Sequence, residues 1–198
     1  APVVDPPAPG GPSGQTELAE DDRFGLLPPH VATRDDLFFL EQENIAVALD
    51  RSTPTVEALL DDRYLRDLHS AMFGEVWEWA GRYRLRETNI GVEPATISTQ
   101  VRTLVADVRT WVDLQTYEPD EGAVRFHHRL VSIHPFPNGN GRHGRVAANY
   151  LIAALGGQWF SWGLDLGLDT AGLRSAYLHG LRMADRGQLQ ELVRFARS

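Results

Sequence analysis

Residues 134–145 read HPFPNGNGRHGR, a histidine followed by a Gly-Asn-Gly turn and two arginines. Apolar residues recur at helical spacing on both sides of this stretch, in residues 126–133 and 146–155. The pattern predicts two helices joined by a tight loop, with His134 ending the first helix and the second beginning near Arg142. We expect the rest of the chain to be arranged around this unit.

The residue types in this loop indicate phosphate binding. Gly139 and Gly141 allow positive φ and a close approach of backbone to a ligand. A helix N-terminus favours an anion, and Arg142 and Arg145, three residues apart on that helix, suit bidentate binding of phosphate. His134, with an ordinary pKa of roughly 6.5, can accept a proton at neutral pH. This combination predicts the transfer of part of a nucleotide to a hydroxyl group.

The same residues resemble the core motif of the Fic family, HxFx(D/E)GN(G/K)RxxR, and match every fixed position except Asn138. The flanking RFHHRLVSIHPF and the upstream FGEVWEWAGRYR are similar to a bacterial Fic subgroup labelled mobile mystery protein B. The resemblance covers roughly residues 33–165. It implies a mainly α fold, a Fic-type helical bundle with a short β-hairpin flap.

The resemblance also implies an activity, that of a protein adenylyltransferase. His134 would deprotonate a Tyr, Thr or Ser hydroxyl of a target protein, which would take AMP from ATP as pyrophosphate leaves. Phe136 would anchor the loop. The implied nucleotide- and phosphate-binding residues are Gly139, Asn140, Gly141, Arg142 and Arg145.

Asn138 departs from the family pattern, because the acidic residue usually found there binds Mg²⁺ (or Mn²⁺). Its neutral carbonyl oxygen can coordinate a metal without the charge that Mg²⁺ prefers. Weak metal-assisted transfer, altered chemistry or nucleotide binding with little activity would each be compatible with this residue. Two alternative functions stay open: a Fic-type phosphotransferase, which usually has Lys in place of Gly141, and a non-catalytic module of a toxin–antitoxin-like pair.

Two further segments acquire roles through the resemblance. Residues 82–98 are expected to form the flap hairpin, in which residues Thr88, Asn89, Ile90 and Gly91 would line up the target segment by strand pairing. Residues 33–50 are expected to form a helix whose Glu43, or alternatively Glu41, would oppose Arg145 and inhibit the site. Solvent-facing carboxylates are the simpler reading of both glutamates.

Composition sets the remaining expectations. A length of 198 residues predicts one domain, here residues 16–198, after a disordered Pro/Gly-rich tail at residues 1–15. Further helices are expected at 53–73, 99–115, 119–133, 170–183 and from 188 onward. A net charge of −8 argues against nucleic-acid binding, and no apolar run approaches a membrane span. The absence of cysteine fits a cytoplasmic protein, with delivery outside the cell as an effector as the alternative. The expected partners are ATP, a target protein and an antitoxin or regulator, and Ala1 is compatible with a processed start.

Overall fold

The computed structural model describes residues 24–49 and 52–198 as a mainly helical fold. The tail expected at residues 1–15 lies outside the described residues. In chain order the elements are α1 (Arg34–Leu49), α2 (Val56–Leu59), α3 (Asp62–Phe73), η2 (Pro94–Thr96), α4 (Ile97–Asp113), α5 (Pro119–Ile133), α6 (Asn140–Ala154), η3 (Leu164–Leu166), α7 (Thr170–Asp185) and α8 (Gln190–Arg197).

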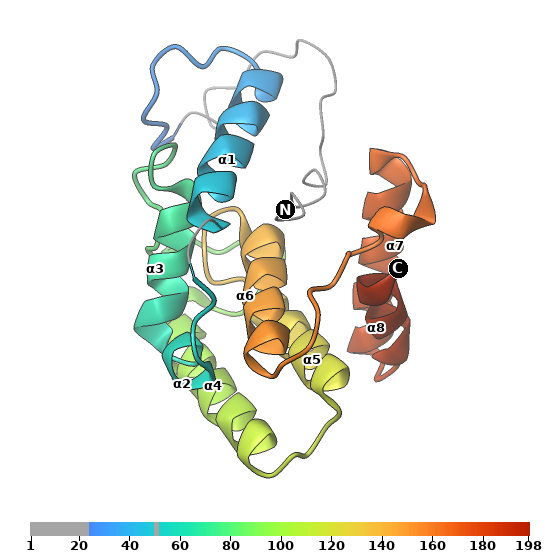
Figure 1. The fold of residues 1–198 in the computed structure, drawn as a ribbon. Helices are drawn as coiled ribbons and strands as arrows, with labels where there is room; N and C mark the ends of the chain where they lie inside the picture. Colours follow the sequence, from blue (N-terminus) through green and yellow to red (C-terminus); the bar gives the residue numbers. More distant parts are fainter. Residues whose placement is uncertain (1–23, 50–51) are drawn as a thin grey trace.

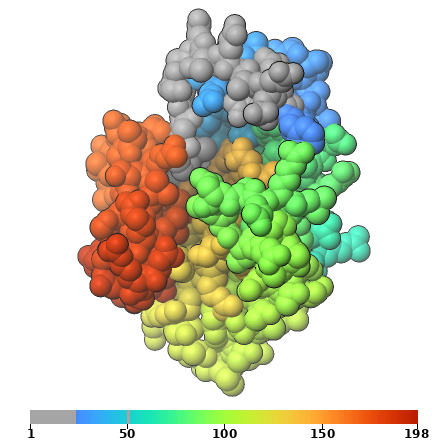
Figure 2. Space-filling model, turned by 180° about the vertical axis from the view of Figure 1, so that it is seen from behind, coloured from blue at the N-terminus to red at the C-terminus, as the bar shows by residue number. Residues whose placement is uncertain are grey.

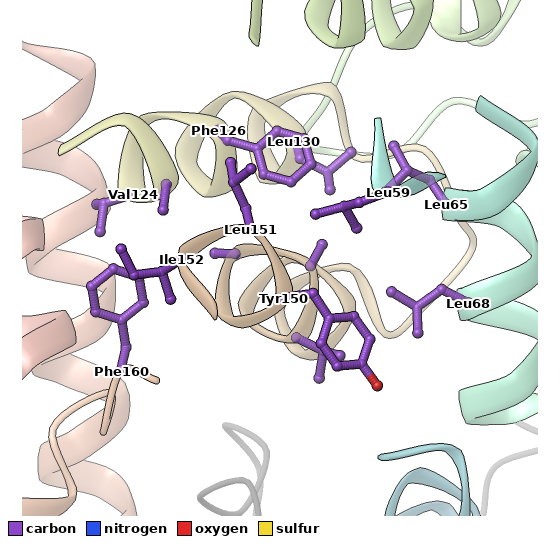
Figure 3. Packing of buried hydrophobic residues seen from close by; sticks show 14 of the residues in the cluster. Leu59, Leu65, Leu68, Val124, Phe126, Leu130, Tyr150, Leu151, Ile152 and Phe160 are labelled. Atoms are coloured by element: carbon purple, nitrogen blue, oxygen red, sulfur yellow. The ribbon is translucent and has the colours of Figure 1, made fainter. Parts of the chain in front are cut away.

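Helix α6 is the centre of the molecule, lying between α3 and α5 with α7 and α8 beyond α5 (Figure 1). Every residue of α6 from Arg142 to Ile152 is buried. Its apolar side chains, including Tyr150 and Leu151, meet Phe126 and Leu130 of α5 on one side and Leu59, Leu65 and Leu68 on another (Figure 3). The helix that follows the motif is therefore surrounded by neighbours, which makes its N-terminus a rigid platform.

The helix starts follow from capping side chains. Thr33 and Asp36 bond each other across the first turn of α1, Asp61 accepts from the N–H groups of Arg63 and Tyr64 at the start of α3, and Asp169 caps α7. The single helix expected over residues 53–73 is instead two helices. The chain leaves helical geometry at Leu60 and re-enters at the Asp61 cap.

The expected β-hairpin at residues 82–98 is wrong: residues 82–93 form an irregular loop, followed by η2 and α4. Two backbone N–H groups of this loop bond the end of α5 and the start of the motif: Arg84 N donates to the Pro135 oxygen at 2.9 Å and Val92 N to the Ile133 oxygen at 3.2 Å. The Arg84 guanidinium is buried and donates to the carbonyls of His134, Arg86 and Val92. These hydrogen bonds satisfy polar groups of the loop without the ladder of a hairpin.

The C-terminal helices are fastened to α5 by polar contacts. His127 Nε2 lies 3.0 Å from the Tyr177 hydroxyl, His128 pairs with Asp185 at 2.8 Å, and Arg197 donates to Asp120. These contacts hold α7 beside the start of α6. None of the described helices is both long and apolar enough to cross a membrane.

Candidate active site

A pocket of about 470 Å³ opens at the N-terminus of α6. Its walls come from α1, from Ile90 of the 82–93 loop, from the end of α5, from residues 138–142 and from α7. In Figure 2 this part of the chain lies in a recess between the green loop and the orange-red C-terminal helices. A cavity of this volume is within the usual range for small-molecule sites.

His134 lines the pocket in the left-handed conformation, with φ 54° and ψ 59°. It ends α5, as the sequence predicts, and the αL turn directs the chain into the motif loop. Burial lowers the pKa of His134 below its ordinary value; the Arg84 guanidinium lowers it further, and the carbonyl of Val131 opposes both. The imidazole is therefore neutral at pH 7 and can accept a proton.

The loop between His134 and α6 is closed by its own polar groups. The Asn140 side chain accepts from the Phe136 N–H at 2.9 Å and donates to the Phe136 carbonyl at 2.8 Å. Phe136 has no exposed surface and stacks on His69 with ring centroids 3.7 Å apart. Phe136 thus fills the interior of the loop. Because the side-chain amide of Asn140 is hydrogen-bonded within the loop, any contact of Asn140 with a phosphate would come from its backbone N–H.

The two motif glycines serve different purposes. Gly139 has φ 79°, and a Cβ there would lie 2.7 Å from the Phe73 ring, so both conformation and space exclude a side chain. A Cβ at Gly141 would make only ordinary contact, 3.6 Å from the Tyr177 hydroxyl. Both glycines line the pocket, where the first-turn N–H groups of α6 have no intrahelical acceptor. The loop therefore offers donors to an anion.

Arg142 is buried and bonds a carboxylate from α1. Its Nη1 donates to Glu41 Oε2 at 2.7 Å, and its guanidinium lies over the Phe73 ring at 4.8 Å. The other Glu41 oxygen accepts from the indole N–H of Trp77 at 2.7 Å. The helix of residues 33–50 thus brings a glutamate to the motif, although the partner is the first motif arginine rather than Arg145.

Arg145 lies one turn further along α6, 4 % exposed, with its guanidinium 5.4 Å from the centre of the Tyr177 ring. Tyr177 itself lines the pocket. Of the two glutamates considered from sequence, Glu43 is exposed and bonds neither arginine within the part of the chain described. The flap residues Thr88, Asn89, Ile90 and Gly91 lie in the irregular loop, and of these Ile90 lines the pocket.

Asn138 is the motif residue available to a metal ion. It lies at the pocket rim with Oδ1 accepting from the Gly139 N–H at 2.7 Å. The described residues contain no group of three or more His, Cys, Asp or Glu side chains that could hold a metal. The nearby Glu41 carboxylate is bound by Arg142. These donors do not fit a Mg²⁺ site built by protein ligands alone.

The sequence patterns did not place several polar and aromatic residues at the site, among them Arg84, Trp77, Arg174 and Tyr177. Trp77 and Arg84 belong to the stretch FGEVWEWAGRYR, so its resemblance to the subgroup was the available signal. Arg174 and Tyr177 share one face of α7 by i, i+3 spacing, but nothing in the sequence indicates that this face meets the motif.

The sequence profile of the Fic/DOC family matches residues 59–152, from the end of α2 through most of α6. The N-terminal Fic domain of a Bartonella effector protein superposes with a TM-score of 0.66 at 17% identity, covering 88% of this chain and 89% of that chain. The fold is therefore that of a Fic domain. Residues 59–152, a little under half of the chain, are similar in sequence to the Fic/DOC family.

Curated relatives carry a related name. "Protein adenylyltransferase Fic" of Drosophila erecta is 25% identical over 166 residues, which is 79% of this chain and 32% of the relative. "Protein adenylyltransferase fic-1" of Caenorhabditis elegans is 30% identical over 123 residues, 59% of this chain and 22% of the relative. The chain thus spans about a third or less of the length of these relatives. The mobile mystery protein B subgroup stays a prediction.

Proposed function

We propose that the protein is a protein adenylyltransferase that transfers AMP from ATP to a Tyr, Thr or Ser hydroxyl of a target protein. The observation that carries the proposal is the sharing of one pocket by His134, the N-terminus of α6 and Arg142. The relatives named as adenylyltransferases favour AMP as the transferred group.

In the proposed reaction His134 takes the proton of the attacking hydroxyl. The hydroxyl oxygen forms a bond to the α-phosphorus, the bond from that phosphorus to the bridging oxygen breaks, and pyrophosphate leaves with the electron pair. The N–H groups at the start of α6 and the Arg142 guanidinium would stabilise the negative charge of the leaving phosphates. Residues 82–93 would hold the target segment beside His134.

Arg174 would add a further positive charge to the nucleotide site. It lines the pocket from α7 and forms no ion pair with any of the described residues. With Leu178 and Leu181 on the same helix face, it forms a wall opposite α1. Mg²⁺ or Mn²⁺, implied by the family, would depend on oxygen atoms of the nucleotide together with Asn138.

Glu41 would act as a brake on this reaction. Because its carboxylate bonds Arg142, it holds the guanidinium that would otherwise grip a phosphate, and it places a negative charge where the polyphosphate would lie. Trp77 holds the second oxygen and so orients the carboxylate. Release of α1, or binding of a regulator to it, would free Arg142.

The test is incubation with ATP labelled at the α- or γ-phosphorus, with Mg²⁺ or Mn²⁺ or with neither, followed by mass spectrometry of the protein and of candidate targets. We expect α-label on protein, and a fall of at least about 100-fold in His134→Ala because general-base catalysis is lost. His179→Ala, an exposed histidine of α7, is the matched control and should transfer normally.

Label from the γ-position would instead support the phosphotransferase alternative. Nucleotide binding without transfer, including in a Glu41→Gln variant, would support the non-catalytic module. Full α-label transfer by His134→Ala would contradict the assignment of the base.

A further inference from the structure

His69 of α3 has no exposed surface and lies against the motif loop. Its ring stacks on Phe136 and packs against Phe73, with centroids 3.7 Å and 4.7 Å away. None of the roles proposed above uses this side chain. Its two ring nitrogens nevertheless both face backbone groups, and one of these groups belongs to the pocket rim.

The hydrogen bonds of His69 define its tautomer. A neutral imidazole has one N–H donor and one acceptor nitrogen. The N–H of Gly81 donates to Nδ1 at 3.0 Å, so Nδ1 is the acceptor. The proton is then on Nε2, which lies 3.0 Å from the carbonyl oxygen of Asn138 and donates to it. The hydrogen bond from the Gly81 N–H to Nδ1 thus makes Nε2 the donor to Asn138.

The carbonyl that His69 holds belongs to the peptide between Asn138 and Gly139. In a trans peptide the C=O and N–H point in opposite directions, and no described peptide is cis. A carbonyl bound to the interior therefore turns the Gly139 N–H toward the open side. There it donates to Asn138 Oδ1, and both residues line the pocket.

A second histidine, His143, connects the start of α6 to α3, the helix that carries His69. His143, in the first turn of α6, has its Nε2 2.8 Å from the carbonyl oxygen of Leu65, which can only accept. Leu65 and His69 are four residues apart on α3 and so lie on one face. The loop and the start of α6 are thereby both fastened to α3, which limits their freedom to turn relative to each other.

We propose that His69 is a positioning residue of the phosphate site, holding the Asn138–Gly139 peptide so that the N–H groups at the start of α6 face the polyphosphate of a nucleotide. The inference rests on the proposed nucleotide-binding function. It gives His69 neither a contact with the nucleotide nor a proton to transfer. A purely structural His69 would stabilise the fold without affecting affinity, so the two roles can be separated.

Two substitutions of His69 each keep one of its two hydrogen bonds and remove the other. In His69→Gln the amide reaches the position of Nε2 and can donate to Asn138, whereas in His69→Asn it lies near Nδ1 and can accept from Gly81. Both variants lose the ring and one hydrogen bond, so their melting temperatures should fall by similar amounts. In equilibrium ATP titrations we expect His69→Gln to stay within about threefold of the wild type and His69→Asn to bind about tenfold more weakly.

Equal ATP affinities for the two variants would overturn this inference and leave the proposed function standing. Absence of ATP binding in both the wild type and Glu41→Gln would overturn both. A measurement on the wild type covers the case in which neither variant folds: ¹⁵N NMR of the histidine rings should show the Nε2–H tautomer for His69, and the Gly139 amide should shift on saturation with ATP. An Nδ1–H tautomer, or an unshifted Gly139 amide, would overturn the inference.

Discussion

Two irregular segments border the pocket, the motif loop of residues 134–139 and the loop of residues 82–93, and they are held in different ways. The motif loop is held from inside: Phe136, Gly139 and the first residue of α6, Asn140, are buried, and each contacts a specific neighbour. The loop of residues 82–93 has one buried side chain that bonds its neighbours, Arg84, and two backbone hydrogen bonds to residues 133 and 135, while Leu85 is 91% exposed. The first segment is part of the core, whereas the second lies on the surface.

This difference matches what each segment would have to do. Phosphate groups of a nucleotide have a fixed geometry, so their donors must be held within a fraction of an ångström. A target protein brings its own backbone, and an adaptable loop suits it better than a preformed rigid edge. The comparison therefore predicts that changes in the motif loop affect nucleotide binding, and changes in the other loop affect transfer to the target.

The largest effect is expected from a pair of glycine substitutions. Gly139→Ala would bring a Cβ within 2.7 Å of Phe73 at φ 79°, and should weaken ATP binding by about 100-fold, or lower stability by about 1–3 kcal/mol. Gly91→Ala would bring its Cβ within 2.6 Å of His134 Cβ. It should retain ATP affinity and lose transfer, as shown by titration and labelling side by side. An equal loss of ATP affinity in both variants would break the comparison.

Substitution of Glu41 should have the next largest effect, and in the opposite direction. Glu41→Gln removes the carboxylate from Arg142, so ATP should bind about tenfold more tightly and transfer should increase. The buried arginine then lacks its ion-pair partner, so the melting temperature without ATP should fall and ATP should restore it. Glu43→Gln, at an exposed position of the same helix, is the control. Unchanged affinity in Glu41→Gln would contradict the proposed brake.

Acid should loosen the motif region before the other loop. Burial lowers the pKa of His143 to about 4 and that of His127 to about 3. Both values lie below that of an unfolded histidine, so the unfolded chain binds more protons between about pH 6.5 and these values, and stability falls as pH drops through that window. After correction for the pH dependence of intrinsic amide exchange, the opening of residues 134–143 should rise several-fold at pH 5 relative to pH 7.5. A larger change in residues 85–91 would contradict this reading.

The smallest effect is expected at Arg174. Because this cation is exposed at the pocket wall, Arg174→Ala should weaken ATP binding by about threefold and make it less sensitive to salt. Arg182→Ala, on the same helix but outside this pocket, should leave affinity unchanged. Equal ATP affinities for Arg174→Ala and Arg182→Ala would contradict a role of Arg174 in nucleotide binding.

Local rules account for the parts of the fold that were predictable. The apolar spacing on both sides of the motif, the Asp169 cap and Pro119 at a helix start identify helices that the structure contains. The helix break at Leu60 and the irregular loop at 82–93 were missed for different reasons. Asp61 is a typical N-cap residue and could have indicated a new helix start, but the continuous apolar spacing favoured a single helix over residues 53–73. The loop involves a long-range contact, because the Arg84 guanidinium donates to the carbonyl of His134, 50 residues away.

The amino-acid sequence by itself determined a helix–loop–helix unit, a glycine with positive φ before α6 and the types of side chain that the loop carries, because these follow from residues a few positions apart. Only the tertiary structure decided that Glu41 bonds Arg142 across 101 residues, that Arg84 bonds the His134 carbonyl across 50 and that His69 holds the Asn138 carbonyl. Each of these contacts joins groups distant in the chain. Which of the available donors and acceptors meet therefore depends on how the helices pack around α6.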